Sequence, residues 1–234
     1  MFFRYICTSL MIVMIHKQNE ELKYLQKLIL QGEHQLLDFK FAITDSRKIA
    51  RSLVAFANSD GGTLLVGVKD NGKIVGMSSD EEIYMVDAAA KMYCKPQVMY
   101  KLRLWEPEEK KQVLEVIVES DNSKLWKAQT EDGRWKVWLR SGDQNIPAGN
   151  TWEQVWRKRR DIVDRTIVFD RKEQLVFSHL APGKKYSIEE IVKFTSLPVS
   201  EAENLISDFV VMGLMKMHMT VPEVQFYVCQ KLSL

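Results

Sequence analysis

The chain has 234 residues, a hydrophobic fraction of 46% and a formal net charge of +2 at pH 7. The length suits two domains, and the hydrophobic content excludes a disordered chain. Because the net charge is small, an anionic partner would have to be held by a local cluster of cations. The three cysteines, Cys7, Cys94 and Cys229, lack the spacing of a zinc site or a disulfide framework, so we expect a protein of the reducing cytoplasm.

Residues 1–18 are expected to lie outside the first domain. The apolar run 6–15 is too short to span a bilayer, and no Ala-x-Ala cleavage site follows it. We interpret the segment as an N-terminal extension packed on the domain or as the product of an upstream start codon, with Met11 and Met14 as alternative starts. No membrane partner is expected.

The pattern that follows predicts a helix and then a strand. Asn19 is a candidate N-cap for a helix over residues 20–31, in which leucines recur at helical spacing, and Gly32 ends it. Residues 36–43 predict the strand.

An amphipathic helix is predicted next, with Asp45 or Ser46 as its N-cap. Its apolar stripe consists of Ile49, Ala50, Leu53, Val54, Phe56 and Ala57. Residues 58–62 form a glycine turn, because glycine accepts positive φ angles. The apolar run 63–68 predicts a buried strand, and Asp70-Asn71-Gly72 predicts a type I′ hairpin.

A helix over residues 80–94 and three strands complete the first domain, for which the boundaries 19–150 are expected. The strands are predicted at 98–105, 112–119 and 134–140, from their alternation of apolar and polar residues. This mixture of helices and strands predicts an α+β fold.

The remainder predicts a basic linker helix over 151–165, capped by Thr151, and a small domain over 166–234. In that domain a first helix is followed by capping boxes at Ser187 and Ser200, which open two more helices. A β-hairpin follows them. Three helices and a hairpin in this order are typical of a winged helix.

Several short motifs follow one another between residues 20 and 150. They are Gly32-Glu33, Asp38-Phe39-Lys40, Ala55-Phe56-Ala57-Asn58, Gly61-Gly62, Gly67-Val68, Asn71-Gly72, Val75-Gly76 and Leu139-Arg140-Ser141-Gly142. In this order they resemble the Schlafen AlbA-2 domain. The resemblance implies a mixed sheet with flanking helices and a regulatory protein that binds nucleic acid, DNA rather than RNA. The C-terminal third looks like the winged helix that frequently follows this domain in bacterial members. The chain lacks a Gly-x-x-x-x-Gly-Lys-Ser/Thr sequence, so ATP binding is not supported.

Nuclease members of the family imply an alternative function. In them an acidic trio is implicated in metal-dependent RNA cleavage, and the matching residues are Glu33, Asp38 and Asp70. Such carboxylates would hold Mg²⁺ or Mn²⁺ at a phosphate. The family usually has glutamate at position 38, and an acidic residue often stands where this chain has Lys69. A metal-dependent endoribonuclease is therefore the alternative, and local capping, pairing and turn formation by the three carboxylates is the preferred interpretation. No other cofactor is expected.

Cations on several predicted elements indicate binding to phosphates, with a solvated surface as the alternative. The predicted nucleic-acid-binding residues are Lys40, Arg47, Lys48, Arg51, Lys101, Arg103, Arg134, Lys136, Trp138, Arg140, Arg157, Lys158, Arg159 and Arg160. Trp138 stands between strand cations, where a base could stack on it.

The third helix of the predicted winged helix has no arginine or lysine between Glu201 and Met212. Phosphates would repel such a helix, so we expect it to contact protein, in a homodimer or with a partner. A pure interaction adaptor is the second alternative. We favour a binding protein over an enzyme.

Overall fold

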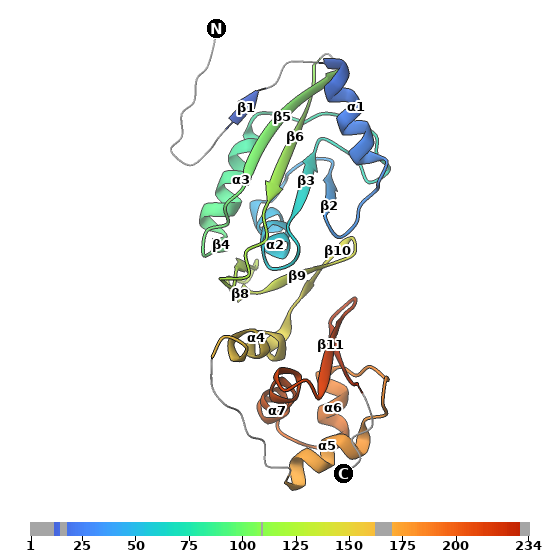
Figure 1. The fold of residues 1–234 in the computed structure, drawn as a ribbon. Coiled ribbons are helices and arrows are strands. Elements are labelled where there is room, and N and C mark those ends of the chain that lie inside the picture. The colour runs from blue at the N-terminus through green and yellow to red at the C-terminus, as the bar shows by residue number, and fades with distance from the viewer. Residues whose placement is uncertain (1–11, 15–17, 109, 162–169, 230–234) are drawn as a thin grey trace. The chain divides into compact units, whose positions relative to one another are not determined.

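The computed structural model describes residues 12–14, 18–108, 110–161 and 170–229 (Figure 1). The chain divides into two compact units, Met1–Asn145 and Ile146–Leu234. Most of the segment 1–18, expected as an extension, lies outside the described residues. Within the described ranges, no helix is both long and apolar enough to cross a membrane.

A five-stranded mixed sheet forms the centre of the first unit, in the order β1-β5-β6-β3-β2. The strands are β1 (Ile12–Met14), β2 (Leu37–Lys40), β3 (Gly62–Val66), β5 (Lys101–Glu108) and β6 (Lys111–Val118). β2 runs parallel to β3 and β1 parallel to β5, whereas β6 is antiparallel to both of its neighbours.

Three helices cover this sheet (Figure 1). The helix α1 (Gln18–Ile29) packs on one face with Phe39, Leu65 and Trp105. The helices α2 (Ser46–Ala57) and α3 (Glu81–Met92) share a core with the residues of the other face, among them Leu64 and Val116. The α+β class with a mixed sheet and flanking helices is thus confirmed.

The α2 helix was predicted closely. All six residues of its apolar stripe are buried, and Asp45 is its N-cap, with a side chain that accepts a hydrogen bond from the Arg47 amide at 2.8 Å. At the other end, Asn58 donates from Nδ2 to the carbonyls of Trp126 and Trp138 at 2.9 and 3.0 Å. These bonds join α2 to the smaller strands beside it.

Two small sheets complete the unit. β4 (Cys94–Lys95), β7 (Lys127–Gln129) and β8 (Trp135–Lys136) form one, and β9 (Trp138–Ser141) pairs with β10 (Gln144–Pro147). The prediction of one continuous strand over residues 134–140 is therefore wrong. Val137 separates two strands of different sheets, and the alternation fails because Leu139 and Arg140 are both buried.

Two predicted local features are also wrong. α1 begins at Gln18, so Asn19 lies inside the helix and is not its cap. Among Asp70, Asn71 and Gly72 only Gly72 has a positive φ, whereas a type I′ turn requires Asn71 to have one as well. The amide of Gly72 donates to the Lys69 carbonyl at 2.7 Å and that of Lys69 donates to the Lys73 carbonyl at 3.0 Å, which closes a three-residue loop.

The second unit consists of helices and a hairpin. They are α4 (Gly149–Lys158), α5 (Arg171–His179), α6 (Ile188–Thr195), α7 (Val199–Val211), β11 (Met215–Met219) and β12 (Val224–Val228). The last five follow the expected order, although the winged-helix assignment itself stays a prediction. The Ser187 capping box is present, but α7 begins at Val199, so Ser200 does not cap it; α4 likewise begins before Thr151.

Gly67 and Gly133 provide a matched test of packing. Both have positive φ angles, but a Cβ on Gly67 would lie 2.7 Å from the carbonyl carbon of Gly76, whereas a Cβ on Gly133 would meet nothing within 4 Å. We expect Gly67→Ala to lower the free energy of unfolding by about 3 kcal/mol, because the new Cβ adds a clash to the strain of the positive φ. Gly133→Ala should lower it by about 1 kcal/mol, because there the positive φ is the only source of strain. Urea unfolding followed by circular dichroism checks this, and equal losses would contradict it.

Candidate nucleic-acid interface

The polar side of α2 carries three cations beside aromatic rings. Arg47, Lys48 and Arg51 lie outside the apolar stripe of the helix. The Arg47 guanidinium carbon is 4.8 Å from the Tyr93 ring centroid, and that of Arg51 is 4.3 Å from the Trp138 ring centroid. A cation over an aromatic ring is attracted by the ring's quadrupole, so these rings help to fix the two arginines.

The small β4-β7-β8 sheet adds two cations near α2, which contacts both β4 and β7. Lys95 on β4 has its ammonium 5.9 Å from the Trp135 ring centroid, and Lys136 on β8 is exposed. The sequence interpretation missed Tyr93, Lys95 and Trp135 as members of this surface. Tyr93 and Lys95 lie at the end of the helix predicted over 80–94 and carry no other signal, and Trp135 stands at an apolar position between Arg134 and Lys136 in the strand predicted over 134–140.

The five cations of this surface, here called the α2 cation cluster, have no carboxylate partner within the described ranges. They are Arg47, Lys48, Arg51, Lys95 and Lys136. The other predicted cations of the first unit all have such a partner; they are Lys40, Lys101, Arg103, Arg134 and Arg140. The cluster is therefore a local excess of positive charge in a chain of almost balanced charge.

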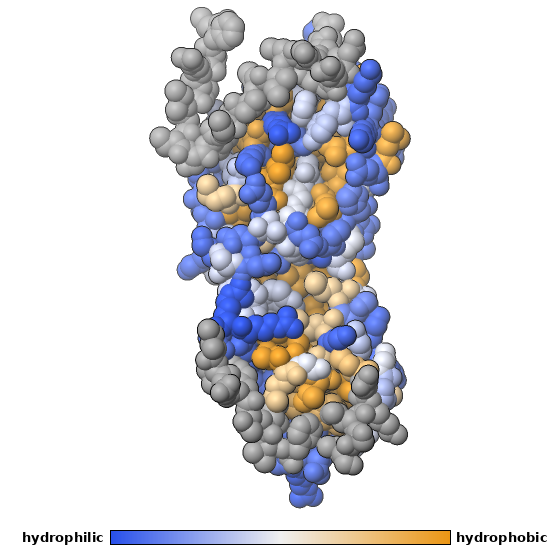
Figure 2. Space-filling view, in the orientation of Figure 1, coloured by the Kyte–Doolittle hydropathy of each residue, from blue (hydrophilic) through white to orange (hydrophobic). Residues whose placement is uncertain are grey.

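The cations of β5 do not join this cluster. Lys101 and Arg103 alternate with Leu102, which belongs to the core on the α2 face, so they point to the α1 face. Lys101 pairs with Glu119 at 2.5 Å and Arg103 lies 3.8 Å from Glu115. Figure 2 accordingly shows hydrophilic and hydrophobic patches side by side over this part of the molecule, with no continuous hydrophilic surface.

Buried Glu115 explains why Arg103 is held on the α1 face. Tyr24 and Trp105 both donate hydrogen bonds to its carboxylate, at 2.8 and 2.9 Å, and their rings stack with centroids 4.9 Å apart. Burial, followed by the hydrogen bond to Glu115, raises the pKa of Tyr24 to about 12. This group ties α1 to the sheet.

Arg140 is a structural residue, which corrects its prediction as a phosphate ligand. Its side chain is 1% exposed. The guanidinium donates to the carbonyls of His34 and Leu37, at 3.2 and 3.1 Å, and to Asn145 Oδ1 at 3.1 Å. It also lies 3.6 Å from the Asp38 carboxylate.

Two further predicted cations are paired. Lys40 lies 3.0 Å from the Asp38 carboxylate and donates to the Phe39 carbonyl at 2.8 Å. Arg134 forms an ion pair with Asp132 in an exposed turn.

Trp138 is half-buried, and its indole N–H is buried with no acceptor in the described part of the chain.

Two of the three predicted acidic residues, Glu33 and Asp38, interact with each other, and Asp70 lies in a separate loop. Asp38 is buried and accepts hydrogen bonds from Lys40 and, at 3.4 Å, from the Ser52 hydroxyl. Burial, and then a hydrogen bond with Asp38, raise the pKa of Glu33, while the Phe39 amide donates to Glu33 at 2.9 Å. Asp70 is exposed in the loop that ends at Gly72.

This arrangement does not fit a divalent metal ion. The described ranges contain no group of three acidic, histidine or cysteine side chains that could hold one. At Asp38, a metal would also have to compete with the ammonium of Lys40 and the guanidinium of Arg140. We derive no cleavage step from these residues.

The backbone groups on the outer edge of β2 form hydrogen bonds with three side chains, those of Glu33, Lys40 and Arg140. Glu33 accepts from the Phe39 amide, Lys40 donates to the Phe39 carbonyl, and Arg140 donates to the Leu37 carbonyl. Since β2 is the last strand of the sheet, these backbone groups have no neighbouring strand on that side.

The basic run at the end of α4 is divided among different partners. Lys158 lies against α7, where its ammonium contacts Asn204 Oδ1, Ser207 Oγ and Asp208 Oδ1 at 2.7 to 2.8 Å. It is therefore not free to bind a phosphate, contrary to the prediction.

The three arginines of the run are more accessible. Arg157 lies 3.4 Å from Glu153, Arg160 lies over the ring of Trp156 at 3.4 Å, and Arg159 is exposed. Figure 2 shows hydrophilic residues over α4.

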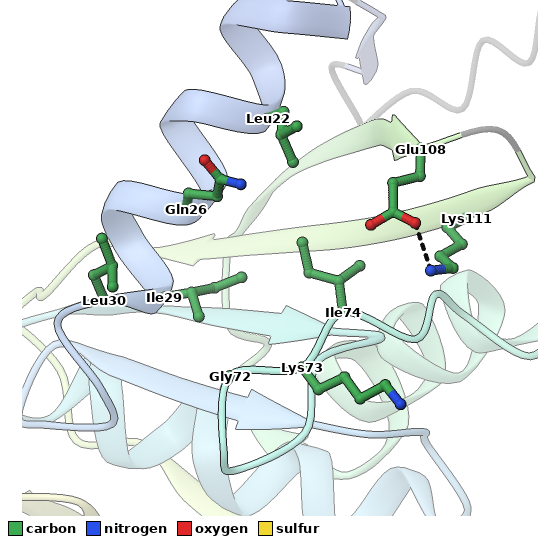
Figure 3. A pocket seen from close by; sticks show the side chains of 9 residues that line it. All are labelled: Leu22, Gln26, Ile29, Leu30, Gly72, Lys73, Ile74, Glu108 and Lys111. Atoms are coloured by element: carbon green, nitrogen blue, oxygen red, sulfur yellow. Dashed lines mark hydrogen bonds and ion pairs between the residues drawn. The ribbon is translucent and has the colours of Figure 1, made fainter.

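A cavity of about 440 Å³ lies elsewhere in the first unit, between the end of α1, the loop after β3 and the β5-β6 turn (Figure 3). Apolar side chains such as Ile29 and Ile74 line it, together with the Glu108–Lys111 ion pair. None of the predicted site residues line it.

The buried position of Arg140 predicts a large effect of a conservative substitution. Arg140→Lys keeps the charge but cannot reach three acceptors at once, so we expect a loss of about 3 kcal/mol in the free energy of unfolding. The control Arg134→Lys, in an exposed pair, should leave it unchanged. Chemical denaturation measures both, and a stable Arg140→Lys variant would contradict the structural role.

Comparisons with known proteins agree with the motifs. Residues 33–149 match the model of the family described as Schlafen, AlbA_2. A crystal structure of the DIP2311 protein from Corynebacterium diphtheriae is similar at a TM-score of 0.43 and 16% identity. That match covers 81% of this chain and 36% of the other, so the chain spans about a third of its length. No curated protein matches.

The matched region contains the carboxylate pair, the buried arginine and the whole α2 cation cluster. It also contains the mixed sheet from β2 to β6. The chain belongs to the Schlafen AlbA_2 family.

Proposed function

We propose that the protein binds nucleic acid, DNA in the first instance, in a regulatory role and through the α2 cation cluster. The observation that carries this proposal is the charge distribution. Five cations lie on and beside α2 without carboxylate partners in the described ranges, whereas Lys101, Arg103 and Arg134 are paired. Family membership supports a role related to nucleic acid.

The chemistry of the cluster suits phosphates. Lysine and arginine side chains that displace the counterions of a nucleic acid provide most of its sequence-independent affinity. Arg47 and Arg51 are held against aromatic rings, so they lose less conformational freedom on binding than free side chains would. Arg157, Arg159 and Arg160 are candidates for additional phosphate contacts.

The acidic α7 is not proposed as a DNA-reading helix. Its polar residues Asn204, Ser207 and Asp208 are engaged by Lys158 from α4, and Glu201 pairs with Lys172. These ion pairs and hydrogen bonds hold the side chains within the unit, and the carboxylates of Glu201 and Asp208 cannot donate hydrogen bonds to the acceptors of base edges.

A salt titration tests the proposal. The association constant for a short DNA duplex should fall steeply between 50 and 200 mM salt, and Lys48→Gln should reduce the slope of log K against log salt by about 1, as one phosphate contact is lost. Lys101→Gln, on the opposite face of the sheet, is the matched control and should leave the slope unchanged. An affinity independent of salt, or equal effects of the two variants, would refute the proposal.

A second candidate function is protein interaction through the second unit. Exposed apolar side chains near the turn between α6 and α7 favour it, with Phe194 41% and Val199 54% exposed. If they mediate a homodimer, the double variant Phe194→Ser and Val199→Ser should be monomeric in analytical ultracentrifugation at a concentration where the native chain is dimeric. A native chain that sediments as a monomer up to about 100 µM would exclude self-association of useful strength.

A further inference from the structure

Cations and aromatic rings are paired repeatedly on the α2 side of the first unit. The pairs are Arg47 with Tyr93 at 4.8 Å, Arg51 with Trp138 at 4.3 Å and Lys95 with Trp135 at 5.9 Å. Arg47 and Arg51 are four residues apart in α2, so they lie on one side of the helix about 6 Å apart along its axis. A guanidinium resting on a ring keeps its second face for another planar group.

Two buried donors in the same pairs have no acceptor in the described part of the chain. They are Arg47 Nε and Trp138 Nε1. A buried N–H without an acceptor is costly, and a ligand at the binding surface can supply the missing acceptor once a neighbouring side chain moves aside, because both atoms are covered by protein. Base carbonyls, base ring nitrogens and phosphate oxygens are all suitable acceptors.

Positive charge, planar side chains and donors without acceptors are together suited to binding a nucleotide whose base is accessible. In a duplex the base faces are stacked and the pairing edges are occupied, so only phosphates and groove edges are presented. In a single strand the bases can stack on aromatic side chains or on guanidinium planes, and their edges are free. Tyr93 and Trp138 are half-buried, so they cannot act as wedges between base pairs, and a base must instead come to them.

We propose that the α2 cation cluster binds single-stranded nucleic acid, with bases stacked on the arginine–aromatic pairs of Arg47 and Arg51. This inference rests on the proposed function, which requires only phosphate binding. It adds that the bases contribute directly to affinity and that a closed duplex is the weaker ligand.

The experiment compares three ligands of equal phosphate number with the full chain. They are a thymidylate strand of about 12 nucleotides, the same strand built from abasic sites, and a duplex with the same number of phosphates in total. Fluorescence anisotropy at fixed salt gives each affinity. We expect the thymidylate strand to bind at least about tenfold more tightly than the abasic strand, because base stacking is lost in the latter, and more tightly than the duplex.

Two variants separate stacking from charge. Arg51→Lys keeps the charge but removes the planar group, so it should weaken binding of the thymidylate strand about fivefold or more and leave binding of the abasic strand unchanged. Lys48→Gln should weaken both strands alike. Thermal unfolding establishes that each variant is folded, and the comparison of ligands on the native chain needs no variant.

The outcomes distinguish the two proposals. Equal affinity for the thymidylate and abasic strands, or tighter binding of the duplex, would overturn the single-strand inference and leave phosphate binding standing. If none of the three ligands binds, the proposed function itself fails.

Discussion

The structure of the first unit depends on one buried guanidinium. Arg140 comes from β9, yet its donors end on the carbonyls of His34 and Leu37, more than 100 positions earlier in the chain. It also faces the Asp38 carboxylate and lies 5.2 Å from the Phe56 ring of α2. A buried arginine is tolerated only where its charge and N–H groups find partners. Because these partners come from the turn before β2, from β2 and from α2, Arg140 fixes these elements together.

The same principle separates structural from available charge. Arg140, Lys40 and Arg103 each have an acidic neighbour that is almost fully buried, so their charges are used within the fold. Arg47 and Arg51 lie instead on aromatic rings, which hold a cation in place without neutralising it. A surface built in this way keeps its positive potential. Whether a cation has a carboxylate or an aromatic ring as its partner therefore identifies the binding face better than the number of basic residues does.

The sequence predicted the fold class and the α2 helix because both depend on periodicity and local capping. Periodicity also explains the failures. Arg140 stands at an outward position of an apparent strand, and only distant carbonyls reveal that it is buried. Asp38 and Lys158 carried similar signals of charge. The partners Ser52 and Arg140 of Asp38, and the partner Asp208 of Lys158, are distant in the sequence and could not be inferred from spacing. Tyr93 and Lys95 joined the candidate site only through tertiary packing, which no local pattern encodes.

The charged groups along β2 also bear on how this domain can assemble. An exposed edge strand is a template on which a second chain can add its own strand, in ordered complexes and in aggregates alike. Here an incoming strand would have to displace the Glu33 carboxylate and the Lys40 ammonium from the Phe39 peptide groups. It would also have to compete with Arg140 for the Leu37 carbonyl. The sheet is thereby closed to extension at β2, and associations of this unit are directed to its side-chain surfaces.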